Sequence, residues 1–263
     1  MLIAGIGDVH GHWRQALALV ESACAKAGVA PTDLSAILQV GDAEAQRTEA
    51  EAEQVPGPPK YRKLGDFHEV MSGEIVFPVP LCFIAGNHEP FPALDADGGL
   101  SAGAGQWGPN VTYLGRAGVV DIEGLRVAFL SGIYGERTFR WAAAGEPRAA
   151  GGKRAGHYTP DELDKVREAL AEGADLLITH DWPYGVADRS RFGVPGDQNV
   201  RALIDQYQPL ASLHGHMHRP CSAVFGKTQV ECLAIVGYHS GDPLSAVGVW
   251  DVDPAARTIG RIV

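Results

Sequence analysis

Five short apolar runs in this chain are each followed directly by Asp, Asn or His. The runs lie at 3–7, 37–41, 81–86, 176–179 and 210–215, and stretches with helical periodicity separate several of them. An alternation of buried strands with helices is typical of α/β architecture. In open sheets of this class, ligands collect beyond the carboxyl ends of the strands. We therefore expect the polar side chains after the five runs to meet at one edge of a sheet.

The composition is that of a folded protein with a substantial core. Of 263 residues, 45% are hydrophobic and 21% are charged, which excludes a largely disordered chain. No linker divides two cores, so we expect a single domain over 1–263. No apolar run approaches the roughly 20 residues of a membrane span, and the N-terminus lacks the features of a signal peptide. The four cysteines form no Cys-x-x-Cys pair. We therefore expect a reduced, cytoplasmic location and no membrane partner.

The charge balance restricts the partners of the chain. Lys and Arg number 22 against 32 Asp and Glu, which gives a formal net charge of −10. Proteins that coat long nucleic acids usually carry a basic excess. A substrate that bears phosphate must then be attracted by local features. Nothing in the sequence indicates an obligate protein partner.

Hydrophobic periodicity predicts the individual elements. Helices are expected at 13–27, 160–171 and 200–207, with a further helical stretch around 61–71, and strands at 3–7, 34–40, 81–85, 176–179 and 210–213. We expect residues 111–131 to form a short β-meander and residues 229–262 to form a closing antiparallel sheet. Residues 43–59 are interpreted as a loop or a frayed helix, and residues 135–156 show no clear period.

Seven side chains with metal-binding chemistry follow the five runs. Asp8 and His10 stand two residues apart, as do His216 and His218, so each pair projects to one side of an extended backbone. Carboxylate, amide and imidazole groups bind hard to borderline metal ions. Seven ligands are too many for one tetrahedral zinc, and they suit two ions about 3.5–4 Å apart that share a carboxylate. The predicted ligands are Asp8, His10, Asp42, Asn87, His180, His216 and His218.

At any single position, a turn, a helix cap or a hydrogen-bonded scaffold role is the simpler interpretation. The coincidence of five such positions favours a metal site instead. Glycines precede Asp8, Asp42, Asn87 and His216, where we expect the backbone to turn tightly.

The other histidines and one acidic stretch are interpreted separately. A structural or surface role is favoured for His12, His68, His157, His214 and His239. We expect Glu44, Glu49, Glu51 and Glu53 to form a solvated face.

Five sequence blocks that contain the predicted ligands resemble the motifs of the calcineurin-like metallophosphoesterases. The blocks are Gly7-Asp8-Val9-His10, Gly41-Asp42, Gly86-Asn87-His88-Glu89, His180 and Gly215-His216-Met217-His218. The resemblance implies an α/β sandwich of two mixed β-sheets flanked by helices. It also implies a dinuclear metal site at the C-terminal ends of the strands.

A narrower resemblance, over roughly residues 1–220, is to the RNA lariat debranching enzymes. It extends to stretches without metal ligands, among them 58–63, 113–119, 131–134 and 180–183. Eukaryotic members of that family have cysteine where this chain has Asp8, and they carry a C-terminal extension that this sequence does not contain. The resemblance implies cleavage of a phosphodiester bond in RNA, at a 2′-5′ linkage.

The same resemblance implies roles for the site residues. Water activated by two divalent ions would attack the phosphorus, and His88 would protonate the leaving oxygen or stabilise the transition state. A structural His88, bonded to Asp42 or Glu89, is the alternative. Manganese is the favoured metal, with iron, zinc or nickel as alternatives. Asp8, His10, Asp42 and His218 would hold one ion, and Asp42, Asn87, His180 and His216 the other, with Asp42 bridging.

Residues 135–157 form the candidate substrate-recognition segment. Five Lys and Arg residues stand there against two Glu residues, and Phe139 and Trp141 add aromatic surface. Cations with aromatic side chains suit RNA, through phosphate pairing and base stacking, whereas the alternative is a flexible solvated loop. In the debranching enzymes the matching segment is the lariat-recognition loop. The candidate substrate-binding residues are Arg137, Arg140, Arg148, Lys153, Arg154 and His157.

Three classes of function follow from these observations. The favoured one is a metal-dependent phosphodiesterase that acts on RNA in the manner of the debranching enzymes. The second is a broader phosphatase of nucleotides or phosphoproteins, or a cyclic nucleotide phosphodiesterase, although residues 42–45 lack the Asp-Arg-Gly of the phosphoprotein phosphatases. The third is a non-catalytic binding module on the same fold, against which the complete set of ligands argues.

Overall fold

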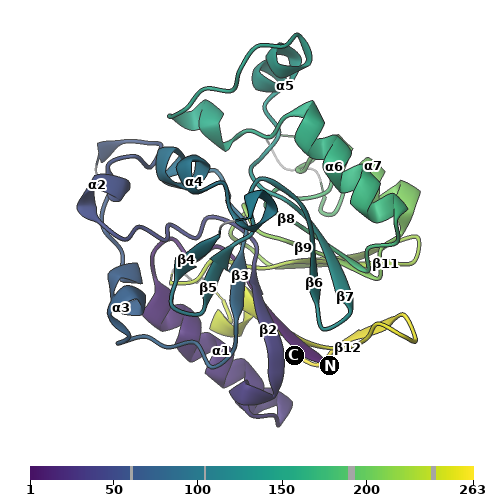
Figure 1. The fold of residues 1–263 in the computed structure, drawn as a ribbon. Helices are drawn as coiled ribbons and strands as arrows, with labels where there is room; N and C mark the ends of the chain where they lie inside the picture. The colour runs from purple at the N-terminus through teal and green to yellow at the C-terminus, as the bar shows by residue number, and fades with distance from the viewer. Residues whose placement is uncertain (60–61, 104, 189–192, 238–240) are drawn as a thin grey trace.

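The structure is a computed structural model that describes residues 1–263 except 60–61, 104, 189–192 and 238–240. His239 and the beginning of the helical stretch expected around 61–71 lie outside the described residues. The described chain forms two β-sheets that pack face to face between helices (Figure 1). Within these residues, no helix has the length and apolar character needed to cross a membrane.

The first sheet has seven strands in the order β13-β12-β1-β2-β3-β5-β4. Its central strands β1, β2, β3 and β5 are parallel, whereas β12, β13 and β4 are antiparallel to their neighbours. The strands are β1 (Leu2–Ile6), β2 (Leu34–Gln39), β3 (Leu81–Phe83), β4 (Gln106–Gly108), β5 (Val111–Tyr113), β12 (Val247–Asp253) and β13 (Thr258–Arg261).

The second sheet has six strands in the order β10-β11-β9-β8-β7-β6. Strands β7, β8, β9 and β11 are parallel, and the antiparallel strands β6 and β10 form the edges. The strands are β6 (Ala117–Ile122), β7 (Leu125–Leu130), β8 (Leu176–Thr179), β9 (Ala211–His214), β10 (Cys221–Phe225) and β11 (Thr228–Cys232).

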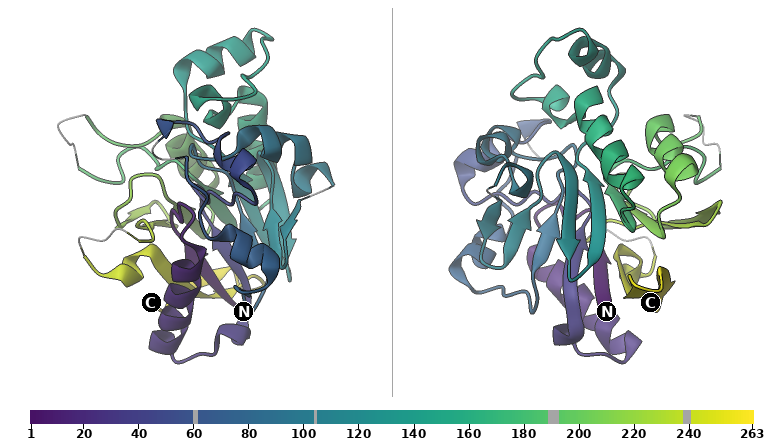
Figure 2. Two further views of the ribbon diagram at one scale, coloured as in Figure 1. Left: turned by 90° about the vertical axis from the view of Figure 1, so that its left-hand side faces the viewer. Right: turned by 45° about the vertical axis from the view of Figure 1, so that its right-hand side comes forward.

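Helices cover the outer faces of both sheets, with α1 on one side and α6 and α7 on the other (Figures 1 and 2). Helix α5 stands at one end of the molecule, away from both sheets, in all three views. The helices are α1 (Trp13–Ala27), α2 (Glu49–Ala52), α3 (Phe67–Ser72), α4 (Phe91–Asp97), α5 (Glu136–Ala143), α6 (Pro160–Ala171) and α7 (Gln198–Tyr207), with the 3₁₀ turns η1 (Pro31–Asp33), η3 (Leu100–Ala102), η4 (Lys153–Gly156) and η5 (Pro243–Ala246).

The alternation of side chains along the strands explains the layers. In β1, Ile3 belongs to the core between the sheets, whereas Ala4 and Ile6 pack with α1 on the outer face. Trp250 of β12 and Phe129 of β7 are buried in the same central core. Large apolar side chains from both sheets therefore fix the distance between the sheets and the position of their carboxyl edges.

Side-chain hydrogen bonds cap the N-terminal ends of α1 and α6. The backbone N–H groups of Trp13 and Arg14 donate to the carboxylate of Asp66, so Asp8 is not needed as a cap. Helix α6 begins with a capping box in which the Thr159 side chain accepts from the Glu162 N–H and the Glu162 carboxylate accepts from the Thr159 N–H. The predicted bounds of both helices are confirmed.

Two expectations about strand pairing are wrong. Strand β5 pairs with β3, whereas β6 and β7 pair in the other sheet, so residues 111–131 form no meander. Strands β11 and β12 likewise lie in different sheets, and only β12 and β13 pair as expected. Residues 135–156 contain a helix, α5. Local alternation predicts strands, but pairing depends on contacts distant in sequence.

Candidate metal centre

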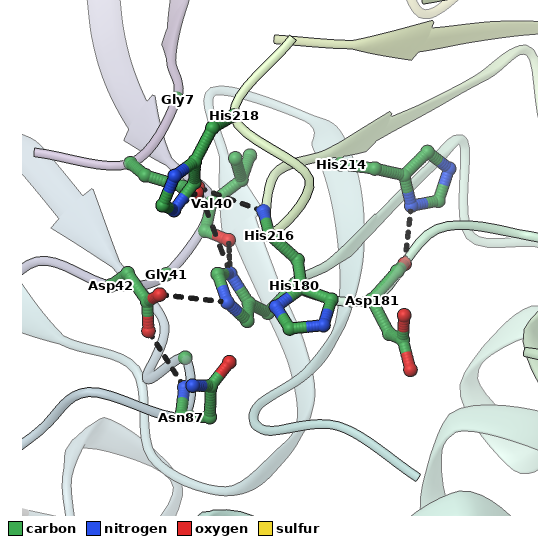
Figure 3. Close-up of polar contacts among 12 residues, drawn as sticks. Gly7, Val40, Gly41, Asp42, Asn87, His180, Asp181, His214, His216 and His218 are labelled. Atoms are coloured by element: carbon green, nitrogen blue, oxygen red, sulfur yellow. Dashed lines mark hydrogen bonds and ion pairs between the residues drawn. The ribbon is translucent and has the colours of Figure 1, made fainter. Parts of the chain in front are cut away.

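The polar side chains after the five apolar runs meet at the carboxyl edge shared by the two sheets. The first sheet supplies Asp8 and His10 after β1, Asp42 after β2 and Asn87 after β3. The second sheet supplies His180 after β8, and His216 and His218 after β9. Figure 3 shows side chains from these separate loops converging on one region. The site therefore exists because two sheets end at the same place.

Glycines allow the loops to approach this closely. A Cβ atom on Gly86 would lie 2.1 Å from Asp42 Oδ1, and one on Gly215 would lie 2.1 Å from Asp8 Oδ1. Both distances are far below van der Waals contact, so a larger residue would displace a site carboxylate. At Gly86 and Gly215 glycine is therefore required because there is no space for a side chain, and not because the backbone turns tightly.

The side chains form two groups that share Asp42. Asp8, His10, Asp42 and His218 offer ligand atoms that lie within 4.8 Å of one another, and so do Asp42, His180 and His216. Asp42 Oδ2 lies 3.3 Å from His180 Nε2 and 3.6 Å from His10 Nε2. One carboxylate oxygen therefore faces both groups, as a bridging ligand must.

The first group shows nitrogen and oxygen atoms aimed at a common point. The Nε2 atoms of His10 and His218 are 3.1 Å apart, and His218 Nε2 lies 3.3 Å from Asp8 Oδ2. Three ligand atoms this close, two of them ring nitrogens, are the arrangement expected around a cation.

Unpaired buried atoms support the same interpretation. Nine buried side-chain nitrogen and oxygen atoms of the described residues have no hydrogen-bond partner, and three of them, Asp8 Oδ2, Asn87 Oδ1 and His180 Nε2, lie in this site. Leaving such atoms unpaired costs about 1–3 kcal/mol each, and all three belong to predicted ligands. Divalent metal ions fit this donor set of carboxylate, amide and imidazole groups.

The backbone holds the opposite sides of these ligands. Asp42 Oδ1 accepts from the N–H groups of Asn87 at 2.7 Å and His88 at 2.8 Å. Asp8 Oδ1 accepts from the His216 N–H at 2.9 Å. His180 Nδ1 lies 2.9 Å from the Val40 carbonyl oxygen and so presents Nε2 to the site. Each ligand is thus oriented through its second polar atom.

Burial and mutual charge shift the titration of the cluster. Burial raises the pKa of Asp8 to about 7, against the attraction of His180. Burial alone would raise the pKa of Asp42, but His180, His10 and His88 hold it well below its ordinary value. Burial lowers the pKa of His216 and of His218 to about 4. Two histidines that stay neutral are suited to bind metal.

The loops are also held in an uncommon backbone conformation. His10, Asp42, His216 and His218 have φ between +46° and +70°, in the left-handed region. Such conformations cost non-glycine residues about 1–3 kcal/mol each and concentrate at functional sites. The surrounding hydrogen bonds stabilise them here.

His88 lies beside the first group and partly faces solvent. Its ring centroid is 5.4 Å from that of His10, and 38% of its side chain is exposed. The backbone N–H of His88 donates to Asp42 Oδ1, while the ring Nδ1 lies 4.0 Å from Glu44 Oε1. The ring is thus next to the metal groups and open to a substrate.

The expectation of a solvated face is wrong for Glu44. This residue is 9% exposed, and its Oε1 lies 2.8 Å from His10 Nδ1. Buried Glu89 accepts from the N–H groups of Ala43 and Glu44 and so fixes this loop. The sequence signal is weak, because Glu44 reaches its position through φ of +45° and a contact 34 residues away. Glu51 is also buried, in a pair with Arg47.

The candidate recognition segment places cations and an aromatic side chain on an exposed surface. The guanidinium groups of Arg137 and Arg154 lie 4.0 and 4.8 Å from the ring centroid of Trp141, which is 40% exposed. Arg140 and Lys153 are exposed. These four cations remain the proposed phosphate-binding set.

Two residues of the segment have other contacts. Arg148 is bonded to Glu162 at 2.6 Å and lies 3.9 Å from Asp95, with 18% of its side chain exposed. His157 Nδ1 lies 2.9 Å from Thr138 Oγ1, inside the segment. These contacts engage both side chains within the protein, and a substrate-binding role for Arg148 and His157 stays a prediction.

Two of the other histidines have scaffold contacts. His214 is buried, and its ring nitrogens lie near Thr179 Oγ1 and Ser212 Oγ. His68 Nδ1 lies 3.0 Å from the Gly65 carbonyl oxygen. Both agree with the structural roles expected from the sequence.

Known proteins share the sequence features of this site. The calcineurin-like phosphoesterase family matches residues 1–220, which include all seven predicted ligands. The chain belongs to this family. Its members are enzymes that hydrolyse phosphate esters, and the two mixed sheets with flanking helices agree with that assignment.

Curated relatives give a more specific similarity. The chain is 34% identical over 192 residues to the lariat debranching enzyme of Homo sapiens, covering 71% of this chain and 33% of that protein. It is 30% identical over 236 residues to the lariat debranching enzyme of Drosophila melanogaster, covering 83% and 43%. The phosphoesterase thus spans less than half the length of these two relatives.

Solved structures confirm the fold. The phosphoesterase aligns with the crystal structure of a protein from Thermus thermophilus at a TM-score of 0.58 and 15% identity, covering 99% of this chain and 97% of the other. It also aligns with GAP50 of Plasmodium at a TM-score of 0.51 and 10% identity, covering 95% and 80%.

Proposed function

We propose that this chain is a phosphodiesterase that uses two divalent metal ions. One ion would be held by Asp8, His10, Asp42 and His218, and the other by Asp42, Asn87, His180 and His216, with manganese favoured over iron, zinc and nickel. The observation that carries the proposal is the pair of groups sharing Asp42 Oδ2. The unpaired atoms of Asp8, Asn87 and His180 support it.

When bound, the two ions supply a lowered water pKa and stabilise negative charge on the reacting phosphate. The protein itself positions the ligands of the ions and supplies the proton for the leaving oxygen. The N–H groups of Asn87 and His88 hold Asp42 Oδ1, which directs Oδ2 towards both groups. His88 lies next to the site and donates a proton to the leaving oxygen.

We infer that the substrate is RNA with a 2′-5′ linkage. The similarity to proteins named lariat debranching enzymes supports this choice. The cations and Trp141 on and around α5 supply a surface for phosphates and bases. The attraction is local, because the whole chain carries a net charge of −10.

A substrate panel tests both parts of the proposal. Metal-depleted protein would be supplied with manganese, iron, zinc or nickel and given 2′-5′ branched RNA, linear RNA, a cyclic nucleotide and a phosphomonoester. We expect the branched RNA to be cleaved fastest, with Asp42→Asn as the inactive control. Equal rates on branched and linear RNA would reject the linkage specificity, and a preference for monoesters would reject a phosphodiesterase.

A further inference from the structure

A cavity of about 520 Å³ lies beside the metal centre. His216, a predicted ligand, forms part of its wall, together with Met217 from the same loop. The remaining wall comes from the loop after β7, from both ends of the connection between β8 and α7, and from the start of α7. Its volume falls within the range of about 300–1,000 Å³ for small-molecule sites. Whatever occupies it would be next to the reacting phosphate.

Two tyrosines give the cavity its aromatic surface. Tyr134 and Tyr184 are each 38% exposed and both line it. The Tyr134 ring packs against Phe139 of α5 and Tyr158, with centroid distances of 5.5 and 6.1 Å. Aromatic side chains held in this way are platforms on which nucleobases stack.

The described part of the wall carries carboxylates and amides. Asp181 and Asp197 line the cavity, and none of the described residues that line it is Lys or Arg. Asp197 accepts hydrogen bonds from Tyr158 and from the Asn199 N–H, so its position is fixed. The carboxylates accept hydrogen bonds, and the amides of Gln198 and Asn199 both donate and accept, so the described wall suits an uncharged ligand with donors and acceptors.

We propose that this cavity binds the nucleoside on one ester arm of the scissile phosphate, with its base against Tyr184. This inference rests on the proposed phosphodiesterase activity and assigns the two sides of the substrate to different surfaces. The neutral nucleoside enters the acidic cavity, while the phosphates of the remaining chain follow the cations around α5.

Two small diesters with the same leaving group test the proposal. Thymidine 5′-(p-nitrophenyl phosphate) carries a nucleoside arm, and methyl p-nitrophenyl phosphate does not. We expect the manganese-loaded protein to show a KM about 5- to 150-fold lower for the thymidine ester, the range that stacking of one base provides. Tyr184→Ala should remove this advantage, and Tyr184→Phe should retain it. Val224→Ala is the control, an exposed apolar residue of β10 outside the cavity, and should leave both KM values unchanged.

Equal KM values for the two esters in the unmodified protein would overturn the proposal, as would a Tyr184→Ala effect of the same size on both. If the protein hydrolyses neither ester, the proposed function fails. A binding measurement then tests the nucleoside site independently of activity. Saturation-transfer NMR with thymidine should then show contact that Tyr184→Ala abolishes. No transfer from the unmodified protein would overturn the nucleoside site.

Discussion

The metal centre and the segment around α5 would both bring positive charge to a phosphodiester, the first through bound metal ions and the second through Lys and Arg side chains. The two regions hold their charged side chains differently. Asp8 and Asp42 are 0–1% exposed, and each has one oxygen fixed by backbone N–H groups. Arg140 and Lys153 are exposed, and Arg137 and Arg154 stack on Trp141. The difference teaches that changes in the first region should remove the reaction, whereas changes in the second should alter the choice of substrate.

The largest effect is expected from Asp42→Asn. The substitution keeps the shape of the side chain but removes the charge shared by both groups. We expect kcat to fall by at least about 10³-fold on RNA and on small diesters alike, since several kcal/mol of transition-state stabilisation depend on the ions. Circular dichroism would confirm that the variant is folded. Activity within tenfold of the unmodified protein would contradict the shared carboxylate.

His88→Ala should lower kcat by about 10²–10⁴-fold while the bound metal is unchanged. If His88 protonates the leaving oxygen, the loss should be smaller for p-nitrophenyl esters, whose leaving group needs no proton. Turnover of RNA and of a p-nitrophenyl diester would be measured in parallel. Equal losses on both substrates would assign His88 a structural or electrostatic role.

Glu44→Ala should weaken metal binding by about 10- to 100-fold, because Glu44 orients the ring of His10. Glu44→Gln should weaken it less, since the amide oxygen can still accept from Nδ1–H. Metal titration by calorimetry measures both, with Glu49→Ala, at an exposed position that begins α2, as the control. An unchanged affinity in Glu44→Ala would show that the contact does not position His10.

The smallest effect on chemistry is expected from the combined change of Arg137, Arg140, Lys153 and Arg154 to Ser. RNA binding should weaken and depend less on salt, with the slope reduced by about 0.7 for each phosphate that the protein no longer neutralises. Hydrolysis of a small diester should stay the same. Replacing the exposed cations Lys26 and Lys227 by Ser provides the control. A parallel fall of RNA and small-diester turnover would make the segment part of the scaffold.

The metal centre is more predictable from the sequence than the surface that surrounds it. Ligands after buried strands are recognisable because Gly-Asp and Gly-His steps are local, and the fold brings strand ends together. The contacts of Glu44 and Arg148 cannot be predicted from local sequence. Glu44 contacts His10, and Arg148 contacts Glu162 and Asp95, all of which are distant in sequence. Helix α5 escapes it because this helix has only eight residues and stands away from both sheets.

The number and position of bound ions test the central claim most directly. The protein would be saturated with manganese, the metal counted by mass spectrometry and the ions located by anomalous diffraction from crystals. We predict two ions per chain, about 3.5–4 Å apart, with Asp42 Oδ2 between them. A single ion at saturation, or two ions that do not share Asp42, would contradict the account.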